Sequence, residues 1–208
     1  MDPFLTTDRM VLRRFTPADA DALVALDRDP LVRRYVDDGE EPTRQGALDM
    51  IEFCLTRYGC HEIVGFWAAV ERSSAGFLGW FHFRPRNGGP ADEPELGYRL
   101  VSSVWSHGFA TEGSRALIDH GFSSGKVRRV VAETMAVHVA SRRVMEKAGM
   151  RLVRSFRADW PVVIPGDEHG DVEYAITRAE WLEDSVRRPA ARRQTEPISS
   201  RRGRTTIA

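Results

Sequence analysis

Three strand-like segments follow one another in the middle of the chain, and this run constrains the fold more than any other feature. Residues 63–71 and 77–84 are rich in aromatic and aliphatic side chains, and Ser-Ser-Ala-Gly at 73–76 supplies a turn between them. An irregular loop at 85–94, with Asn-Gly-Gly-Pro, leads to a third strand at 95–101. Because no helix separates these strands, we expect an antiparallel meander within one sheet.

Helices and further strands are predicted on both sides of the meander. Before it lie a strand within 7–15, on the apolar stretch Met-Val-Leu at 10–12, a helix opened by Thr16 and Pro17 and ended by Pro30, and a helix that follows Pro42 and Thr43. After it lie a helix at 111–122, a strand at 128–134, a helix at 139–148 closed by Gly149, strands at 152–156 and 172–176, and a last helix opened by a capping box at 177–180. The expected fold class is therefore α/β (α+β), with a mixed, mostly antiparallel central sheet flanked by helices.

Composition favours one domain and a polar tail. The 208 residues are 42% hydrophobic and include five Trp, which suffices for a core spanning residues 1–186. Residues 187–208 carry seven Arg and one Glu, a net charge of +6, with almost no apolar side chains, so we expect a disordered Arg-rich tail. The tail is either a solvated end or a weak attachment to nucleic acid. Nucleic acid is otherwise not an expected partner.

The sequence gives no sign of a membrane or secreted protein. It lacks a run of eighteen apolar residues, and its first residues do not have the pattern of a signal peptide. Two cysteines, Cys54 and Cys60, do not make a disulfide framework. We therefore expect a cytoplasmic protein with no membrane partner.

A strand–turn–helix junction in the centre of the chain has the features of an anion site. The strand at 95–101 ends, Gly108 follows in a turn, and the small residues Ala110 and Thr111 open a helix. Backbone N–H groups at a helix N-terminus, together with the helix dipole, bind phosphate oxygens. Gly108 also lets the backbone approach a ligand closely. Strand–turn–helix junctions with glycine are common and mostly structural, so the pattern alone leaves both interpretations open.

Two motifs carry a family resemblance. The chain reads Glu-Leu-Gly-Tyr at 95–98, Trp-x-x-Gly-x-Ala-Thr-Glu at 105–112, and Ala-Ser-Arg-Arg-Val-Met-Glu-Lys-Ala-Gly-Met at 140–150. These stretches resemble the cofactor signatures of the GNAT N-acetyltransferases, and more narrowly of the RimJ/RimL-like branch, which acetylates protein N-termini and small amines. The resemblance covers residues 6–182, within a GNAT domain at 1–186.

The resemblance implies where acetyl-CoA, the co-substrate, would bind. A V-shaped split is expected between the fourth and fifth strands, 95–101 and 128–134. The thioester carbonyl would lie against the backbone near residues 100–102, and the pyrophosphate on N–H groups of residues 107–112. The implied cofactor-binding residues are Leu100, Val101, Ser102, His107, Gly108, Phe109, Ala110, Thr111, Glu112, His138, Ser141 and Met145.

The resemblance also suggests catalytic roles, with two departures. Glu95 is the candidate base that deprotonates the amine, and Ser141 is the candidate donor to the leaving thiolate. Many relatives have Asn at the position of His138, and a histidine there could donate a hydrogen bond or titrate near neutrality. Many also have a tyrosine acid where this chain has Met145. The general acid is therefore Ser141, another group, or none.

Acceptor residues are expected on the sheet and in one acidic loop. The aromatic residues Trp67, Trp80, Phe81 and Phe83 form either core or a wall of the substrate cleft, and Trp80 is the candidate for the latter. The segment 159–171 joins the last two strands, and its acidic residues, with Trp160, would form a rim attractive to a cationic amine; they are Asp159, Asp167, Glu168 and Asp171, of which Asp159 and Glu168, together with Trp160, are the candidate binding residues. A merely solvated acidic loop is the alternative. The six histidines show no metal-ligand spacing, so no metal is expected.

The resulting hypothesis is an acetyl-CoA-dependent N-acetyltransferase. It would acetylate a primary amine, either a protein N-terminal α-amine or a small molecule, by direct attack without a covalent enzyme intermediate. The alternative is a catalytically silent acyl-CoA-binding regulatory domain with a basic tail. A homodimer is left open.

Overall fold

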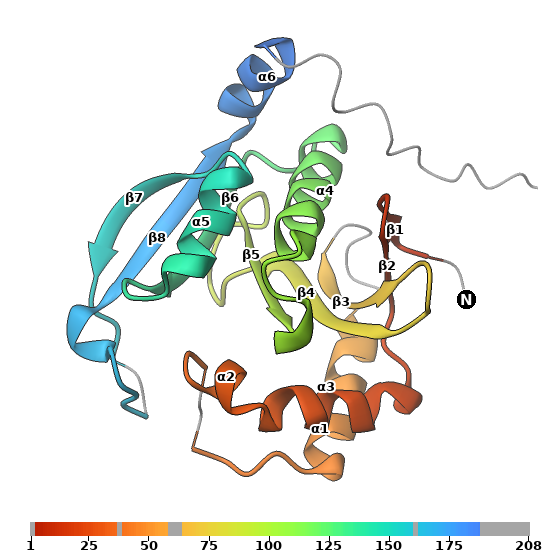
Figure 1. The fold of residues 1–208 in the computed structure, drawn as a ribbon. Helices are drawn as coiled ribbons and strands as arrows, with labels where there is room; N and C mark the ends of the chain where they lie inside the picture. The colour runs from red at the N-terminus through yellow and green to blue at the C-terminus, as the bar shows by residue number, and fades with distance from the viewer. Residues whose placement is uncertain (1–2, 37–38, 58–63, 160–161, 188–208) are drawn as a thin grey trace, which may run out of the picture.

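The computed structural model describes residues 3–36, 39–57, 64–159 and 162–187, and its eight strands form one sheet in the order β1-β2-β3-β4-β5-β6-β8-β7 (Figure 1). The strands are β1 (Leu5–Thr6), β2 (Met10–Arg13), β3 (Gly65–Glu71), β4 (Phe77–Pro85), β5 (Pro94–Leu100), β6 (Arg129–Met135), β7 (Arg151–Phe156) and β8 (Asp171–Thr177). The helices are α1 (Ala20–Arg28), α2 (Pro30–Arg33), α3 (Arg44–Arg57), α4 (Phe109–Ser123), α5 (Val139–Lys147) and α6 (Arg178–Arg187), with 3-10 turns at Pro17–Asp19, Ser102–Val104 and Asp167–His169.

The strand pairing confirms the expected mixed, mostly antiparallel sheet and its split. Every neighbouring pair in the described sheet is antiparallel except β5 and β6, which run parallel. These two strands pair only at Glu95 and Val131. Beyond that point they no longer share ladder hydrogen bonds, so the sheet opens between their carboxyl ends. This is the V-shaped split predicted between the fourth and fifth strands.

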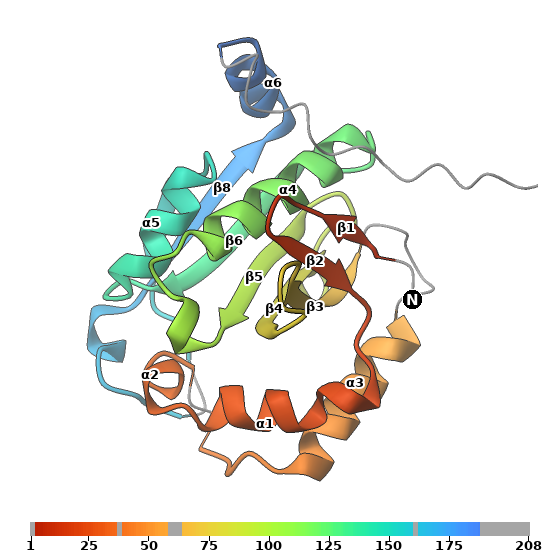
Figure 2. The same cartoon turned by 45° about the vertical axis from the view of Figure 1, so that its right-hand side comes forward.

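Helices cover the two faces of the sheet in separate groups (Figure 2). On one face, Gly113 and Gly121 of α4 lie against the rings of Phe81 and Phe83, and a Cβ at either glycine would overlap those rings. Because these two glycines have no side chains, α4 can pack close to β4. On the other face, α1 and α3 pack against β3 and β4, where Phe53 of α3 contacts Phe66 with ring centroids 6.4 Å apart.

Local signals explain most element ends. The last helix is opened by the predicted capping box, in which Thr177 Oγ1 donates to Glu180 at 2.7 Å and the Glu180 N–H donates back at 3.3 Å. Gly149 follows α5 with a φ of +93°, and the Met150 N–H donates to the Met145 carbonyl at 3.0 Å. The hairpin between β3 and β4 turns at 72–76 as expected.

Three predicted boundaries were wrong or incomplete. Of the segment 7–15, only Met10–Arg13 forms a strand, β2, and a short strand that was not predicted, β1, precedes it at Leu5–Thr6. Thr7 and Met10 close the turn between the two through the bonds Thr7 N to Met10 O (2.9 Å) and Met10 N to Thr7 Oγ1 (3.0 Å). The helix predicted at 111–122 begins earlier, at Phe109. Pro30, expected only to end a helix, opens the short α2, whose first N–H groups are capped by Asp29.

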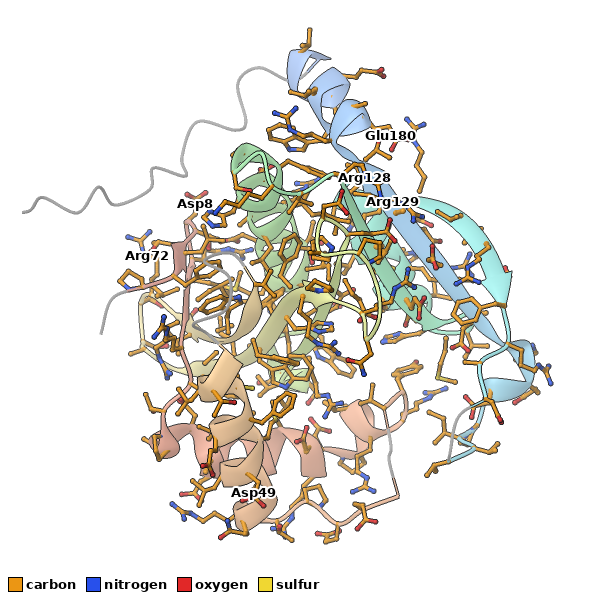
Figure 3. The ribbon with its side chains drawn as sticks, turned by 180° about the vertical axis from the view of Figure 1, so that it is seen from behind. Asp8, Asp49, Arg72, Arg128, Arg129 and Glu180 are labelled. Carbon is orange, nitrogen blue, oxygen red and sulfur yellow. The ribbon has the colours of Figure 1, made fainter. Side chains whose placement is uncertain are left out.

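The far end of the sheet is held by charged contacts. Figure 3 shows Arg128 and Arg129 together at the start of β6, with Glu180 of α6 nearby. The Arg178 N–H donates to the Arg128 carbonyl at 2.9 Å, so the antiparallel pairing of β6 with β8 continues as far as the first residue of α6. Arg129 pairs with Glu93 at 3.1 Å. These contacts hold β5, β6 and β8 together at the end opposite the split.

Some expectations lie outside the described residues. Cys60, Trp160 and the tail at 188–208 are among them. Within the described residues no helix has both the length and the apolar character needed to cross a membrane.

Candidate functional site

Two cavities meet at the split between β5 and β6. The first, of about 380 Å³, is lined by the start of α4 and by α5, and is called here the helix-end cavity. The second, of about 540 Å³, is lined by the carboxylates Glu95, Glu133, Asp167 and Asp171, and is called here the acidic cavity. Both are large enough for part of a small-molecule ligand.

The N-terminus of α4 opens into the helix-end cavity. Gly108 caps the helix with a φ of +86°, a conformation that favours glycine. The Glu112 N–H donates to the Gly108 carbonyl at 3.0 Å, so the helical ladder begins there. The N–H groups of Phe109, Ala110 and Thr111, which line the cavity with Gly108, therefore have no acceptor within the helix. This is the geometry of an anion site.

Glu112 has a structural role in addition to its place in the signature. Its carboxylate accepts hydrogen bonds from Thr7 Oγ1 at 2.6 Å and from Arg9 Nε at 2.7 Å. Arg9 also pairs with it at 2.6 Å and donates to the His107 carbonyl at 2.9 Å. These bonds outweigh the desolvation of the half-buried group and lower the pKa of Glu112. Arg9 thus compensates the one acidic side chain in the first turn of α4.

The end of β5 presents only one of the three predicted backbone positions to the split. The Val101 N–H donates to the Leu78 carbonyl of β4 at 3.0 Å, and Ser102 hydrogen-bonds to Asp29. N–H and C=O groups of alternate residues in a strand face opposite neighbours. Leu100 therefore faces the split, where its carbonyl accepts from Trp105 Nε1 at 2.8 Å. Of Leu100, Val101 and Ser102, only Leu100 lines the helix-end cavity, and His107 and Glu112 do not line it.

Helix α5 forms the opposite wall of the split. The buried Ser141 places its Oγ 3.0 Å from the Tyr98 hydroxyl, and burial raises the pKa of Tyr98 to about 12. Met145 is buried and lines the acidic cavity. Ser141 and Tyr98 line both cavities, so they lie where the two meet.

His138 caps the start of α5 and closes over the junction of the cavities. Its ring stacks on Tyr35 with centroids 3.7 Å apart and planes 3° apart, and its Nδ1 has no hydrogen-bond partner. Burial, with the nearby Arg34, lowers the pKa of His138 to about 4. The expectation that His138 could titrate near neutrality is therefore wrong, because the ring is neutral there. A neutral ring still offers one donor and one acceptor.

Glu95 and Glu133 face each other across the closed end of the split. Burial raises the pKa of Glu95, while Arg84 and Arg86 oppose that rise. Burial also raises the pKa of Glu133, against the effect of Arg86, and the charges of Glu95 and Glu173 add to the rise. Two carboxylates in one cavity repel each other, which favours holding a proton or binding a cation.

Arg86 ties this carboxylate pair to the far end of the sheet. Its guanidinium pairs with Glu133, and with Glu173 of β8 at 3.2 Å. Arg154 of β7 pairs with Glu173 at 2.8 Å, and burial of Glu173 is outweighed by these bonds, which lower its pKa. Glu133 is thus held by an ion-pair network, whereas the Glu95 carboxylate has Arg84 and Arg86 as charged neighbours but no hydrogen bond or ion pair to them within the described residues. Glu95 is the more available base of the two.

Two of the four acidic residues expected at the rim line the acidic cavity, and they are not the two candidate binding residues. Asp167 and Asp171 line the acidic cavity, whereas Asp159 and Glu168 are exposed and do not line it. Glu168 accepts a hydrogen bond from the Gly166 N–H at 3.0 Å. The single-turn 3-10 helix at Asp167–His169 rotates successive side chains to different sides, so Asp167 faces inward and Glu168 outward. Trp160 lies outside the described residues.

The aromatic residues of β3 and β4 divide as the alternation of a strand requires. Trp67, Phe81 and Phe83 are buried in the core, and Trp80 lies on the opposite face. Trp80 lines the acidic cavity next to His82, and its Nε1 and His82 Nδ1 are buried without hydrogen-bond partners. Burial and the charge of Arg84 lower the pKa of His82 to about 3. Two residues of the cavity wall thus each have a buried ring nitrogen without a hydrogen-bond partner.

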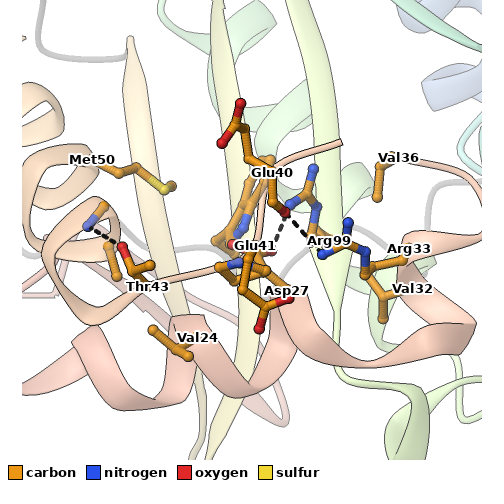
Figure 4. A pocket seen from close by; sticks show the side chains of 14 residues that line it. Val24, Asp27, Val32, Arg33, Val36, Glu40, Glu41, Thr43, Met50 and Arg99 are labelled. Carbon is orange, nitrogen blue, oxygen red and sulfur yellow. Dashed lines mark hydrogen bonds and ion pairs between the residues drawn. The ribbon is translucent and has the colours of Figure 1, made fainter. Parts of the chain in front are cut away.

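A third, outer cavity of about 490 Å³ adjoins the acidic cavity under α1 and α3 (Figure 4). Trp80, Arg99 and Val36 line both. Arg99 pairs with Asp27 of α1 at 2.5 Å and lies 5.3 Å from the centre of the Trp80 ring. The pair therefore links β5 to α1 where the outer cavity and the acidic cavity adjoin.

Sequence reasoning missed Glu133, Tyr98 and Arg86. Glu133 interrupts an otherwise apolar strand, which was the available signal for a functional carboxylate. Tyr98 was part of the Glu-Leu-Gly-Tyr motif but had no assigned role. Among the described residues, no three His, Cys, Asp or Glu side chains lie close enough to hold a metal ion, and the absence of a metal stays a prediction.

Comparison with known proteins gives matches over most of the chain. A sequence model described as "Acetyltransferase (GNAT) domain" matches residues 9–151. The FsC-acetyl coenzyme A-N(2)-transacetylase of Aspergillus fumigatus is 31% identical over 189 residues, 86% of this chain and 78% of that protein. An acetyltransferase of the GNAT family from Bacillus anthracis has a TM-score of 0.70 at 21% identity, covering 84% of this chain and 98% of that chain. RimL, a ribosomal L7/L12 alpha-N-protein acetyltransferase solved with coenzyme A, has a TM-score of 0.70 at 18% identity, covering 85% and 98%.

Proposed function

The chain belongs to the GNAT acetyltransferase family, and from this premise we propose that it transfers the acetyl group of acetyl-CoA to a primary amine by direct attack. One observation carries the proposal. A helix N-terminus with three unused N–H groups opens into a cavity that joins, through the split in the sheet, a second cavity lined by four carboxylates. The first cavity suits a phosphate-bearing donor, and the second suits a cationic amine.

The residues of the helix-end cavity fit acetyl-CoA. Phe109, Ala110 and Thr111 offer N–H groups for the pyrophosphate, and Arg143 and Lys147 add positive charge on the exposed side of α5. The unpartnered Nδ1 of His138 lies where the pantetheine arm would pass. Bound there, acetyl-CoA supplies an activated acetyl thioester. Leu100, whose backbone faces the split, is the proposed N–H donor for the oxyanion.

The acidic cavity selects and prepares the amine. Its carboxylates attract a protonated amine, and an ammonium must lose a proton before it can attack. Glu95 is the proposed base, because its raised pKa brings it closer to the working pH and it is not held in the Arg86 network. The proposed substrate class is therefore a primary amine that is cationic before reaction.

The relatives support both acceptor types. The Aspergillus protein is named for an N(2)-transacetylase reaction with acetyl coenzyme A, and RimL is named for a protein α-amine. RimL as a structural neighbour agrees with the RimJ/RimL-like branch. The outer cavity favours an acceptor that extends beyond a single amine group.

The test combines binding with turnover. Isothermal titration with acetyl-CoA and a thiol-release assay across small amines, polyamines and N-terminal peptides should show binding and release with at least one class. Tight binding with no release on any amine would favour the silent acyl-CoA-binding alternative. No binding would overturn the cofactor site itself.

A substitution at the start of α4 tests the cofactor site. Ala110→Glu keeps a helix-compatible residue in the first turn, but it places a carboxylate among the N–H groups that would meet the pyrophosphate. We expect at least a tenfold loss of acetyl-CoA affinity by titration, about 1.4 kcal/mol. The control Ser123→Glu adds the same charge at the other end of α4 and should bind normally. Equal affinity of the Ala110 variant and the unmodified protein would contradict the site.

A further inference from the structure

Six residues line both cavities, and two of them hydrogen-bond to each other through their hydroxyl groups. The shared residues are Tyr35, Val36, Tyr98, Arg99, His138 and Ser141. If the proposed function holds, the acetyl group passes from donor to amine at this junction. The Tyr98 hydroxyl, from β5, lies 3.0 Å from Ser141 Oγ, from α5, so the pair spans the split at that point.

We propose that Tyr98 and Ser141 act together as a hydrogen-bond donor site for the thiolate sulfur that leaves during acetyl transfer. The proposal rests on the proposed function and assigns a role to Tyr98. The position at which many relatives have a tyrosine acid is occupied here by Met145, which has no proton to donate. The hydroxyl comes instead from the other wall of the split.

One of the two hydroxyl hydrogens of the pair is not used in the bond between Tyr98 and Ser141 and can be donated to another group. Two hydroxyl groups carry two hydrogens, and the bond between Tyr98 and Ser141 uses one of them, whichever group donates. The Tyr98 hydroxyl also lies 3.3 Å from the Ser141 carbonyl, which is longer than the usual O–H···O distance of about 2.8 Å. The second hydrogen can therefore turn toward a stronger acceptor, and a thiolate is one.

The pKa of Tyr98 decides whether the pair donates a hydrogen bond to the sulfur or transfers a proton to it. Its pKa is raised to about 12, whereas an ordinary thiol ionises near about 8.5. A proton would move uphill from this phenol to a thiolate, so the pair stabilises the charge by hydrogen bonding and keeps its protons. As the C–S bond breaks, its electron pair moves to sulfur. Of the two protons that the ammonium nitrogen loses, Glu95 accepts one and the sulfur gains the other.

Other charged groups at the cavity act on the sulfur independently of this pair. Arg99, paired with Asp27, lies on β5, and Arg143 and Lys147 lie on α5. His138 is neutral near pH 7 because its pKa is about 4. These groups stay in place when the Tyr98 hydroxyl is removed. A difference in the pKa of the bound thiol between Tyr98→Phe and the unmodified protein therefore measures the effect of the hydroxyl.

The test measures ionisation of the thiol of bound coenzyme A, which requires no amine. The complex with coenzyme A is titrated with base while the ultraviolet absorbance of the thiolate is followed, with the complex of desulfo-coenzyme A as blank. We expect Tyr98→Phe to raise the pKa of the bound thiol by about one unit, a tenfold change in its dissociation constant. Ser141→Ala should give a shift of similar size, and the double variant no more than the larger single shift.

Tyr174→Phe is the matched control. It removes a buried hydroxyl that donates to Glu146 at 2.9 Å, outside both cavities, and the bound thiol should titrate as in the unmodified protein. An unchanged thiol pKa in both Tyr98→Phe and Ser141→Ala, with coenzyme A bound, would overturn the proposal and leave the proposed function intact. Failure of the unmodified protein to bind coenzyme A would overturn the proposed function instead.

Discussion

Two carboxylates of the acidic cavity have different surroundings, and this difference assigns their roles. Glu133 is paired with Arg86 and neighbours Glu173, so its position is fixed within the sheet. Glu95 lies at the last paired position before the split opens, and burial raises its pKa. A base needs a lone pair that is not already committed, which favours Glu95.

The Glu95→Gln variant tests this assignment. The carboxylate is the active form, and its pKa is raised, so the rate of the unmodified protein should fall as pH drops through that raised pKa. We expect Glu95→Gln to lower kcat by about a hundredfold or more, to remove this acidic limb and to leave acetyl-CoA affinity unchanged. Steady-state rates against pH and titration of the cofactor measure both.

Glu133→Gln serves as the comparison. It removes the second carboxylate of the same cavity and should cost less in kcat, because the acidic limb remains with Glu95. A larger loss in Glu133→Gln than in Glu95→Gln, with loss of the limb, would transfer the role of base to Glu133.

The residues of the motif predicted which secondary-structure element they form, but not which residues they contact. The Glu-Leu-Gly-Tyr stretch predicted a strand, and β5 confirms it. The contact of Tyr98 with Ser141 joins residues 43 positions apart, and depends on how α5 packs across the split. No local pattern in the sequence encodes such a contact.

At the scale of the elements, α4 has to lie very close to the sheet for its N-terminus to reach the split. Gly113 makes this approach, since a Cβ there would overlap the Phe81 ring, with ring atoms at 2.7 and 2.9 Å among its nearest neighbours. Phe81 is fully buried and cannot move away without disturbing the core. The close packing of α4 and the proposed acetyl-CoA site are therefore linked through one helix.

Gly113→Ala should therefore destabilise the folded protein, although a Gly-to-Ala change inside a helix usually stabilises it. In an unconstrained helix interior, Gly to Ala stabilises by about 1 kcal/mol, but overpacking costs about 1–3 kcal/mol. We expect a net loss in the free energy of unfolding, measured by urea denaturation, together with weaker acetyl-CoA binding. Gly46→Ala in α3, whose Cβ would meet only Thr43 Oγ1 at 3.3 Å, is the control and should be neutral or stabilising. A stabilised Gly113 variant would contradict the close approach.

Element prediction succeeded where the signal was local. Capping boxes, the glycine after α5 and the hairpin turn depend on residues within a few positions of each other, so the sequence located them. The turn that divides β1 from β2 depends on the pairing of Thr7 with Met10 and on the clamp from Glu112 of α4. That clamp comes from a residue 105 positions away, and for this reason the sequence predicted β2 but not the turn or the short β1 before it.

For the whole molecule, two buried histidines make stability sensitive to mild acid. Burial lowers the pKa of His82 to about 3 and that of His138 to about 4, against an ordinary value of 6.5. Below pH 6.5 the unfolded chain therefore binds protons that the folded protein does not. The free energy of unfolding should fall with decreasing pH by about 1.4 kcal/mol per unit for each histidine.

Urea unfolding at pH values between about 7.5 and 5 checks this, because paired carboxylates such as Glu112 lose their contribution only at lower pH. His82→Phe keeps a flat ring beside Gly97 and removes the titrating group, so its stability should depend less steeply on pH. An equally steep dependence in His82→Phe would show that this residue is not the source. His169 is exposed and provides a control substitution to Phe.

The sequence by itself determined the family, the order of the elements, and the helix N-terminus that would hold the donor, because these depend on motifs and on local periodicity. The tertiary structure decided which side chains share the acidic cavity. It placed Asp167, Asp171 and Glu133 inside and left Asp159 and Glu168 exposed. It also brought Tyr98 to Ser141. The physical reason is that one strand pair, β5 and β6, separates after a single bridge, and the groups facing that opening come from elements far apart in the chain.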